Sequence, residues 1–233
     1  MTFLTRIPWP IRFEFEEDTF AKGLLFLPLI GAIIGLPMYL LARYVPFEQA
    51  YLRSFLLLLA YLVIAGGLHL DGLADYFDGI FSGRSRERIL EIMKDSSVGT
   101  FGVGGICLYF LGMFIGFMEV TPLTVFMMPV VARSVGVAIC AFGQYPKGEG
   151  MGQPMVNYGQ WYHGLGVVVI LLPVLFFAGK NYLIAGVITL AIMMVFHLRT
   201  TQIIGGITGD VIGAAIELSQ VVWLLSMLAL GGL

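Results

Sequence analysis

The sequence predicts an all-α fold: a polytopic membrane helix bundle of about seven transmembrane helices with a short cytoplasmic interfacial helix. Hydrophobic residues make up 58% of the 233 residues and charged residues only 12%, whereas soluble domains carry roughly 25% charged residues. The mean hydropathy is +0.91. Apolar runs near the length that crosses a bilayer recur along the chain. Because no linker interrupts them, we expect residues 1–233 to form a single integral membrane domain.

The apolar runs place the expected spans, in chain order, at 23–43, 54–70, 101–118, 123–142, 164–178, 182–198 and 211–230. The fifth run is short and is expected to be tilted or re-entrant. After the second span, the segment from Arg84 to Lys94 carries an apolar stripe of Ile89, Ile92 and Met93. This stripe predicts the interfacial helix.

Two pairs of glycines have the spacing of close helix contacts. Gly31 and Gly35 lie four residues apart in the first span, and Gly112 and Gly116 do so in the third. Small residues at this spacing let helix backbones approach each other within a membrane. We therefore expect both pairs to be packing faces.

Positive residues predict the orientation, because cytoplasmic loops are rich in Lys and Arg. With the N-terminus inside, the cytoplasmic segments carry Arg6, Arg12, Lys22, Arg84, Arg86, Arg88, Lys94, Lys147 and Arg199. The opposite segments carry only Arg43, Arg53 and Lys180. This orientation brings the loops 71–100, 143–163 and 199–210 to one face. The sequence therefore predicts one functional site at the cytoplasmic end of the bundle.

The strongest chemical signal is the run His69-Leu-Asp71-Gly-Leu-Ala-Asp75-Tyr-Phe-Asp78-Gly. In a helix, Asp71, Asp75 and Asp78 fall within an arc of roughly 60° and face the same way. Three like charges repel each other, and Mg²⁺ or Mn²⁺ would relieve that repulsion through hard oxygen ligands. The alternative is that the aspartates only end the helix in water. We expect a metal site, with His69 assisting as base or ligand.

A second acidic pair, Asp210 and Glu217, lies two helical turns apart and shares a face. Glu217 is expected about 10 Å deeper in the membrane than Asp210, at 1.5 Å per residue. An isolated carboxylate at that depth is costly, so a partner is implied. The alternative is a Glu217 that is hydrogen-bonded inside the bundle. The glycine-rich turn before Asp210, which contains Thr208, has backbone N–H groups that suit a phosphate.

Basic residues suggest contacts to an anion. Arg133 lies in the middle of the fourth span and needs an acidic partner, for which Glu217 and a substrate phosphate are equal candidates. Lys94 and the three nearby arginines suit either a diphosphate or lipid headgroups. Asp95 is expected to cap its turn or to join the metal site. The net charge of −2 gives no basic field that would attract nucleic acid.

Four blocks of the sequence together resemble the cobalamin synthase family of adenosylcobinamide-GDP ribazoletransferases. The blocks run from Phe3 to Pro8, Gly66 to Gly79, Lys94 to Gly102 and Gly205 to Leu218. The family tends to have Pro-x-Ala-Arg before a Gly-Met-Gly turn. Here Lys147 stands in that region and is expected to replace the arginine at a substrate phosphate.

The resemblance implies that a hydroxyl of α-ribazole, or of its 5′-phosphate, attacks the phosphorus attached to cobinamide in adenosylcobinamide-GDP. GMP leaves, and adenosylcobalamin or its 5′-phosphate forms. The resemblance also implies Mg²⁺ as cofactor, and Asp78 or His69 as the group that takes the proton. Asp210 and Glu217 would complete a second metal site or orient the ribazole. The expected substrate-binding residues are Lys94, Asp95, Arg133, Lys147 and Thr208.

The resemblance further implies the cytoplasmic (inner) membrane of a prokaryote, with membrane lipid around the protein and the active site on the cytoplasmic face. It leaves the oligomeric state open, a homo-oligomer included. Two competing functions remain. A CDP-alcohol phosphotransferase also uses clustered aspartates, but Asp75 stands where its motif has an arginine. A cation transporter, with Glu217 and Arg133 as a relay, would spread polar groups through the membrane, whereas most acids here lie at one end.

Overall fold

The computed structural model describes residues 17–46, 48–146 and 150–231, and this part of the chain is helical with no strand. The elements are α1 (Glu17–Lys22), the 3-10 helix η1 (Gly23–Phe26), α2 (Leu27–Tyr44), α3 (Ala50–Ala65), α4 (Leu68–Phe81), α5 (Arg86–Ile92), α6 (Thr100–Phe117), α7 (Pro122–Phe142), α8 (Gln153–Tyr158), α9 (Trp161–Ala178), α10 (Lys180–Ile204) and α11 (Gly209–Ala229). The predicted all-α membrane bundle is confirmed.

Six segments within the described residues are long and apolar enough to cross a bilayer, and a bent helix pair would make a seventh span. The six are Thr19–Tyr44, Thr100–Phe117, Pro122–Phe142, Trp161–Ala178, Lys180–Ile204 and Gly209–Ala229. Each overlaps one of the spans that the apolar runs predict. The short interfacial helix expected between Arg84 and Lys94 is α5. The chain is therefore a polytopic membrane protein.

The expected span 54–70 is wrong at its C-terminal end. The helix α3 stops at Ala65, and α4 begins at Leu68 after a bend of 98°. Gly66 has a φ of 78°, a conformation that residues with a Cβ rarely adopt. The acidic motif consequently lies on a helix of its own and not at the end of α3.

The prediction of a loop at 199–210 is also wrong for residues 199–204, because α10 continues to Ile204 and includes Arg199. Gly205 ends α10 in the left-handed conformation, with a φ of 73°, which is a common way to terminate a helix. Only a short turn remains before α11. The loop expected at 143–163 likewise contains the short helix α8 and the first residues of α9.

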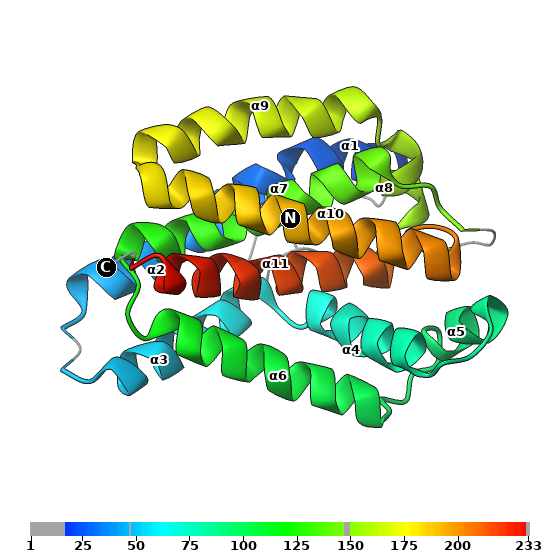
Figure 1. The fold of residues 1–233 in the computed structure, drawn as a ribbon, viewed down its shortest axis with the longest axis horizontal. Helices are drawn as coiled ribbons and strands as arrows, with labels where there is room; N and C mark the ends of the chain where they lie inside the picture. The colour runs from blue at the N-terminus through cyan, green and yellow to red at the C-terminus, as the bar shows by residue number, and fades with distance from the viewer. Residues whose placement is uncertain (1–16, 47, 147–149, 232–233) are drawn as a thin grey trace.

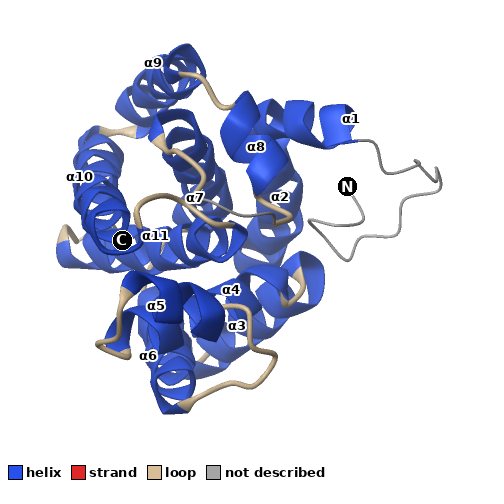
Figure 2. Ribbon diagram, turned by 90° about the vertical axis from the view of Figure 1, so that its right-hand side faces the viewer, coloured by secondary structure: helices blue, strands red, loops and turns tan. Residues whose placement is uncertain are grey.

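The helices α7 and α11 form the centre of the bundle. Figure 1 shows α9 and α10 on one side of α11 and α3, α4 and α6 on the other, and Figure 2 shows the same grouping end-on. In the 18-residue apolar stretch of each helix, 78% of the residues are buried in α7 and 67% in α11, but only 17% in α9. The apolar outer face of α9 suits contact with lipid tails.

Both glycine pairs pack as predicted. A Cβ on Gly31 or Gly35 would collide with the backbone of α7 at Pro129 and Phe126. A Cβ on Gly116 would lie 2.6 Å from the Cβ of Leu224 on α11, and Gly112 faces the same helix. These contacts hold α2 against α7 and α6 against α11.

Candidate active site

A cavity of about 300 Å³ opens at the end of the bundle where α4, α5, α8 and the start of α11 meet. Its polar lining comes from His69, Lys94, Tyr145, Thr208 and Asp210. The apolar part of the lining is Phe20, Leu68, Leu90, Met93, Met151, Met155 and Ile212. A mixed lining of this kind suits a substrate with both apolar and charged parts. The segments 71–100, 143–163 and 199–210, which the sequence predicts to share one face, all contribute to this lining.

Two glycines bring the acidic helix α4 against α11. A Cβ on Gly72 would lie 2.9 Å from the Cα of Asp210, and a Cβ on Gly213 would lie 3.2 Å from the Cα of His69. Neither position has room for a side chain, so the two backbones are in direct contact. This crossing places the first half of the acidic motif beside the N-terminus of α11.

Three of the predicted metal ligands gather at this crossing. The charges that act most strongly on the Asp75 carboxyl are those of Asp210 and then Asp71. Asp71 is exposed, and Asp75 and Asp210 are half-buried. Lys94, in the turn that follows α5, supplies a positive charge that acts on Asp210. The region is thus acidic, with one lysine at its edge.

These carboxylates suit a magnesium ion that the substrate helps to bind. In the described part of the chain, no three His, Cys, Asp or Glu side chains are arranged to hold a metal by themselves. Mg²⁺ in phosphate-transferring enzymes usually takes one or two carboxylates, with water and substrate phosphates as its other ligands. The repulsion among Asp71, Asp75 and Asp210 fits this kind of site, because a cation and a phosphate would neutralise it together.

Asp78 shares the face of the motif but makes different contacts. Its two carboxylate oxygens accept hydrogen bonds from the backbone N–H groups of Gly99 at 2.7 Å and Gly102 at 2.8 Å. Those groups lie at the N-terminus of α6, where N–H groups lack partners within the helix and favour negative charge. In this structure Asp78 therefore anchors α6 to α4.

The predicted substrate-binding residues other than Arg133 fall into three groups. Lys94 and Thr208 line the cavity, and Thr208 also caps α11 by accepting a hydrogen bond from Val211 N at 3.3 Å. Asp95 caps its own turn by accepting bonds from the hydroxyl and the backbone N–H of Ser97, which lower the pKa of the Asp95 carboxyl. Lys147 lies outside the described residues.

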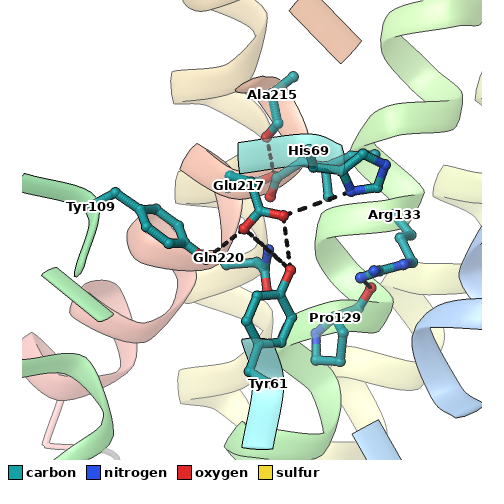
Figure 3. Close-up of polar contacts among 10 residues, drawn as sticks. Tyr61, His69, Tyr109, Pro129, Arg133, Ala215, Glu217 and Gln220 are labelled. Atoms are coloured by element: carbon teal, nitrogen blue, oxygen red, sulfur yellow. Dashed lines mark hydrogen bonds and ion pairs between the residues drawn. The ribbon is translucent and has the colours of Figure 1, made fainter. Parts of the chain in front are cut away.

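Glu217 is 2% exposed and lies in a buried polar cluster away from the three gathered aspartates. It accepts hydrogen bonds from the Tyr61 hydroxyl at 2.8 Å and from Gln220 Nε2 at 2.8 Å, and a further bond from the Tyr109 hydroxyl. His69 Nδ1 lies 3.6 Å from Glu217 Oε1. Figure 3 shows these groups converging on the carboxylate. The expectation that Glu217 has partners inside the bundle is confirmed.

Arg133 is fully buried on α7. Its Nη1 donates to the Pro129 carbonyl at 3.5 Å, while Nε and Nη2 have no partner among the described residues. No ion pair joins Arg133 to Glu217 in this part of the chain. The charge of Arg133 does interact electrostatically with the Tyr61 hydroxyl. Of the two partners that the sequence suggests, Glu217 is thus not paired with Arg133 in this structure, and a substrate phosphate stays a prediction.

The sequence reasoning missed four residues near these sites. Tyr61, Tyr109 and Gln220 surround Glu217, and Tyr145 lines the cavity. Burial, and then the charge of Asp210, raise the pKa of the Tyr145 hydroxyl. The one available signal was Gln220, which lies one helical turn after Glu217. Nothing in the two apolar runs that contain the other tyrosines indicates that they converge.

Comparison with known proteins gives a consistent result. Residues 1–228 match the family model described as cobalamin-5-phosphate synthase. A protein of Alkaliphilus oremlandii named adenosylcobinamide-GDP ribazoletransferase is 39% identical over 228 residues, covering 97% of this chain and 93% of the relative. Proteins with the same name from Listeria monocytogenes and Clostridium acetobutylicum are 36% and 35% identical, covering 99% and 97% of this chain and 96% and 93% of their own lengths. No solved structure matches the chain.

Proposed function

Since the chain belongs to the cobalamin-5-phosphate synthase family, we propose that it joins α-ribazole, or its 5′-phosphate, to adenosylcobinamide-GDP. A hydroxyl oxygen of the ribazole forms a new bond to the phosphorus that carries cobinamide. The bond from that phosphorus to GMP breaks, and GMP leaves with the electron pair. The product is adenosylcobalamin or its 5′-phosphate, which completes the nucleotide loop. The lipid-synthase and transporter alternatives are not favoured by the family match.

The observation that carries this proposal is the cavity at the α4–α11 crossing. A corrinoid and a benzimidazole base present broad apolar surfaces, whereas the diphosphate between cobinamide and guanosine is strongly anionic. The cavity offers Met and Leu side chains on its walls together with Lys94, Thr208 and the N-terminus of α11. Helix N-termini and lysines are favourable neighbours for phosphate groups. The apolar and the polar parts of the substrates each have a matching surface.

We assign the acidic residues as follows. Asp71, Asp75 and Asp210 hold Mg²⁺, which, when bound, supplies positive charge to the diphosphate oxygens. Lys94 binds a phosphate oxygen, and Arg133 or Lys147 adds a further positive charge. Asp78 keeps α6 against α4, because both of its oxygens are engaged by backbone N–H groups. His69, on the cavity wall, takes the proton of the attacking hydroxyl at Nε2.

The proposed location is the cytoplasmic membrane of a prokaryote, with the cavity on the cytoplasmic side. The excess of Lys and Arg in the segments at that end of the bundle supports this orientation. Lys94 and the arginines of α5 belong to that excess. A nucleotide substrate made in the cytoplasm would then reach the site without crossing the membrane.

The test is GMP release by the purified protein in lipid, with adenosylcobinamide-GDP, α-ribazole 5′-phosphate and Mg²⁺. We expect GMP to appear in equal amount with the cobalamin product, and to disappear when α-ribazole phosphate or Mg²⁺ is left out. The Asp75→Asn variant should lose this activity. Glu119→Gln is the matched control, because Glu119 is exposed in the turn between α6 and α7 and does not line the cavity. Ion flux in sealed vesicles without GMP release would overturn the proposal.

A further inference from the structure

His69 lies between the cavity and the buried cluster around Glu217. One side of the His69 side chain lines the cavity, and the side chain is 13% exposed. On the other side, Nδ1 faces Glu217 Oε1 at 3.6 Å, which is ion-pair range and longer than a hydrogen bond. Glu217 itself is 2% exposed and does not line the cavity. Among the described side chains in polar contact with Glu217, His69 is the one that lines the cavity.

The position of Glu217 is fixed by donors from three helices. Tyr61 comes from α3, Tyr109 from α6 and Gln220 from the next turn of α11, and all three donate to its carboxylate (Figure 3). Gln220 Nε2 also donates to the Tyr61 hydroxyl at 2.7 Å. Because a buried acceptor that loses its donors is costly, such a network holds one arrangement. The oxygen that faces His69 is thus held in place.

The helix α11 also fixes the backbone of His69. Gly213 contacts the His69 main chain, since a Cβ at that position would lie 3.2 Å from the His69 Cα. Glu217 follows Gly213 by four residues, so it lies on the same face of α11 one turn further along. One face of α11 therefore contacts the His69 backbone through Gly213 and places Glu217 next to the His69 ring.

This arrangement selects one tautomer of the imidazole ring. The Glu217 carboxylate accepts hydrogen bonds from three donors, and a ring nitrogen 3.6 Å from such an acceptor faces it most favourably when that nitrogen carries the hydrogen. In a neutral ring the other nitrogen, Nε2, then has a free lone pair. In the described part of the chain no hydrogen bond engages Nε2, and no nitrogen of His69 is among the buried polar atoms that lack a partner. Nε2 is consequently open to a hydroxyl donor.

We propose that Glu217 is a positioning residue for the transfer reaction: from behind the cavity wall it fixes the ring of His69 so that Nε2 accepts a hydrogen bond from the attacking ribazole hydroxyl. This inference rests on the proposed function. Glu217 orients a ring on the cavity wall and binds neither metal nor ribazole. Carboxylates that orient metal-binding histidines affect metal affinity or activity by roughly 10-fold to 100-fold, and we expect an effect of the same order here.

A double-mutant cycle tests the proposal in the GMP-release assay. Glu217→Gln should lower kcat by roughly 10-fold to 100-fold and change the KM for adenosylcobinamide-GDP little, because Glu217 does not touch the substrate. In a His69→Ala background the same substitution should have almost no further effect. Equal effects of Glu217→Gln in both backgrounds would mean that Glu217 only supports the fold, and would overturn the proposal. Ser219→Ala is the matched control, because its buried hydroxyl on α11 bonds only to its own helix.

A second measurement does not depend on activity. The chain contains three histidines, so the ¹⁵N chemical shifts of His69 can be assigned in labelled protein by comparison with His69→Ala. For the neutral ring, the wild-type protein should show Nδ1 with its hydrogen and Nε2 without. The opposite tautomer, or an equal mixture, would overturn the proposal. If the tautomer is as expected but the wild-type protein releases no GMP, the proposed reaction is wrong while the control of His69 by Glu217 stands.

Discussion

Asp78 separates two explanations of the acidic motif, because its sequence position suggests a metal ligand while its contacts suggest a structural anchor. Its oxygens accept two backbone hydrogen bonds, from Gly99 at 2.7 Å and Gly102 at 2.8 Å. In Asp78→Asn the amide keeps one acceptor oxygen, so one of the two N–H groups loses its partner. Leaving such a buried donor unsatisfied costs about 1–3 kcal/mol. We expect the free energy of unfolding to fall by about 2 kcal/mol.

The assay is equilibrium unfolding of the wild-type protein and the variant in detergent micelles, followed by helical circular dichroism. Asp78→Ala should be the more destabilised variant, because both N–H groups then lose their partner. The Mg²⁺ concentration that gives half-maximal GMP release should stay close to the wild-type value in whatever folded Asp78→Asn protein remains. If Asp78→Asn kept the wild-type free energy of unfolding but needed a much higher Mg²⁺ concentration for activity, Asp78 would be a metal ligand and not an anchor of α6.

Three further predictions follow from the α4–α11 crossing and the buried arginine. Asp75→Asn should abolish turnover and leave folding and membrane insertion intact, as measured by GMP release and by membrane fractionation; near-normal activity would contradict the assignment of Asp75 to the metal site. Gly72→Ala should reduce both stability and activity, because its Cβ would lie 2.9 Å from the Cα of Asp210, whereas Gly104→Ala, with nothing within 4 Å, should change neither. Arg133→Ala should raise the KM for adenosylcobinamide-GDP if the guanidinium binds a phosphate; loss of folded protein with no such KM change would show that Arg133 serves the bundle.

Much of the fold could be predicted from the sequence, because the signals involved are local. Apolar runs of bilayer length predict the spans, and glycines four residues apart predict the contacts of α2 with α7 and of α6 with α11. The break between α3 and α4 was not predicted. The expected span 54–70 runs through Gly66 and Gly67, whereas the positive φ of Gly66 accompanies a bend of 98° between α3 and α4. Apolar composition continues through this corner, so a hydropathy pattern does not reveal it.

The candidate site could be predicted only in part, because helical spacing shows which residues share a face but not what faces them. Asp71, Asp75 and Asp78 do lie on one helix, as their spacing predicts. The start of α6 happens to meet that helix at Asp78, which accepts its N–H groups. In the same way, the spacing of Asp210 and Glu217 predicts a shared face, but Tyr61 and Tyr109 come from distant helices to enclose Glu217. Long-range contacts of this kind leave no local pattern.

We propose that carboxylates from two helices, Asp71 and Asp75 on α4 and Asp210 on α11, bind a divalent ion together with the diphosphate of the substrate. Electron paramagnetic resonance of Mn²⁺, titrated into the protein in lipid nanodiscs, measures this binding directly. We predict tight binding of Mn²⁺ by the wild-type protein when adenosylcobinamide-GDP is present, and a large loss of affinity in Asp210→Asn. Equal Mn²⁺ affinity in the wild-type protein and Asp210→Asn would contradict the account.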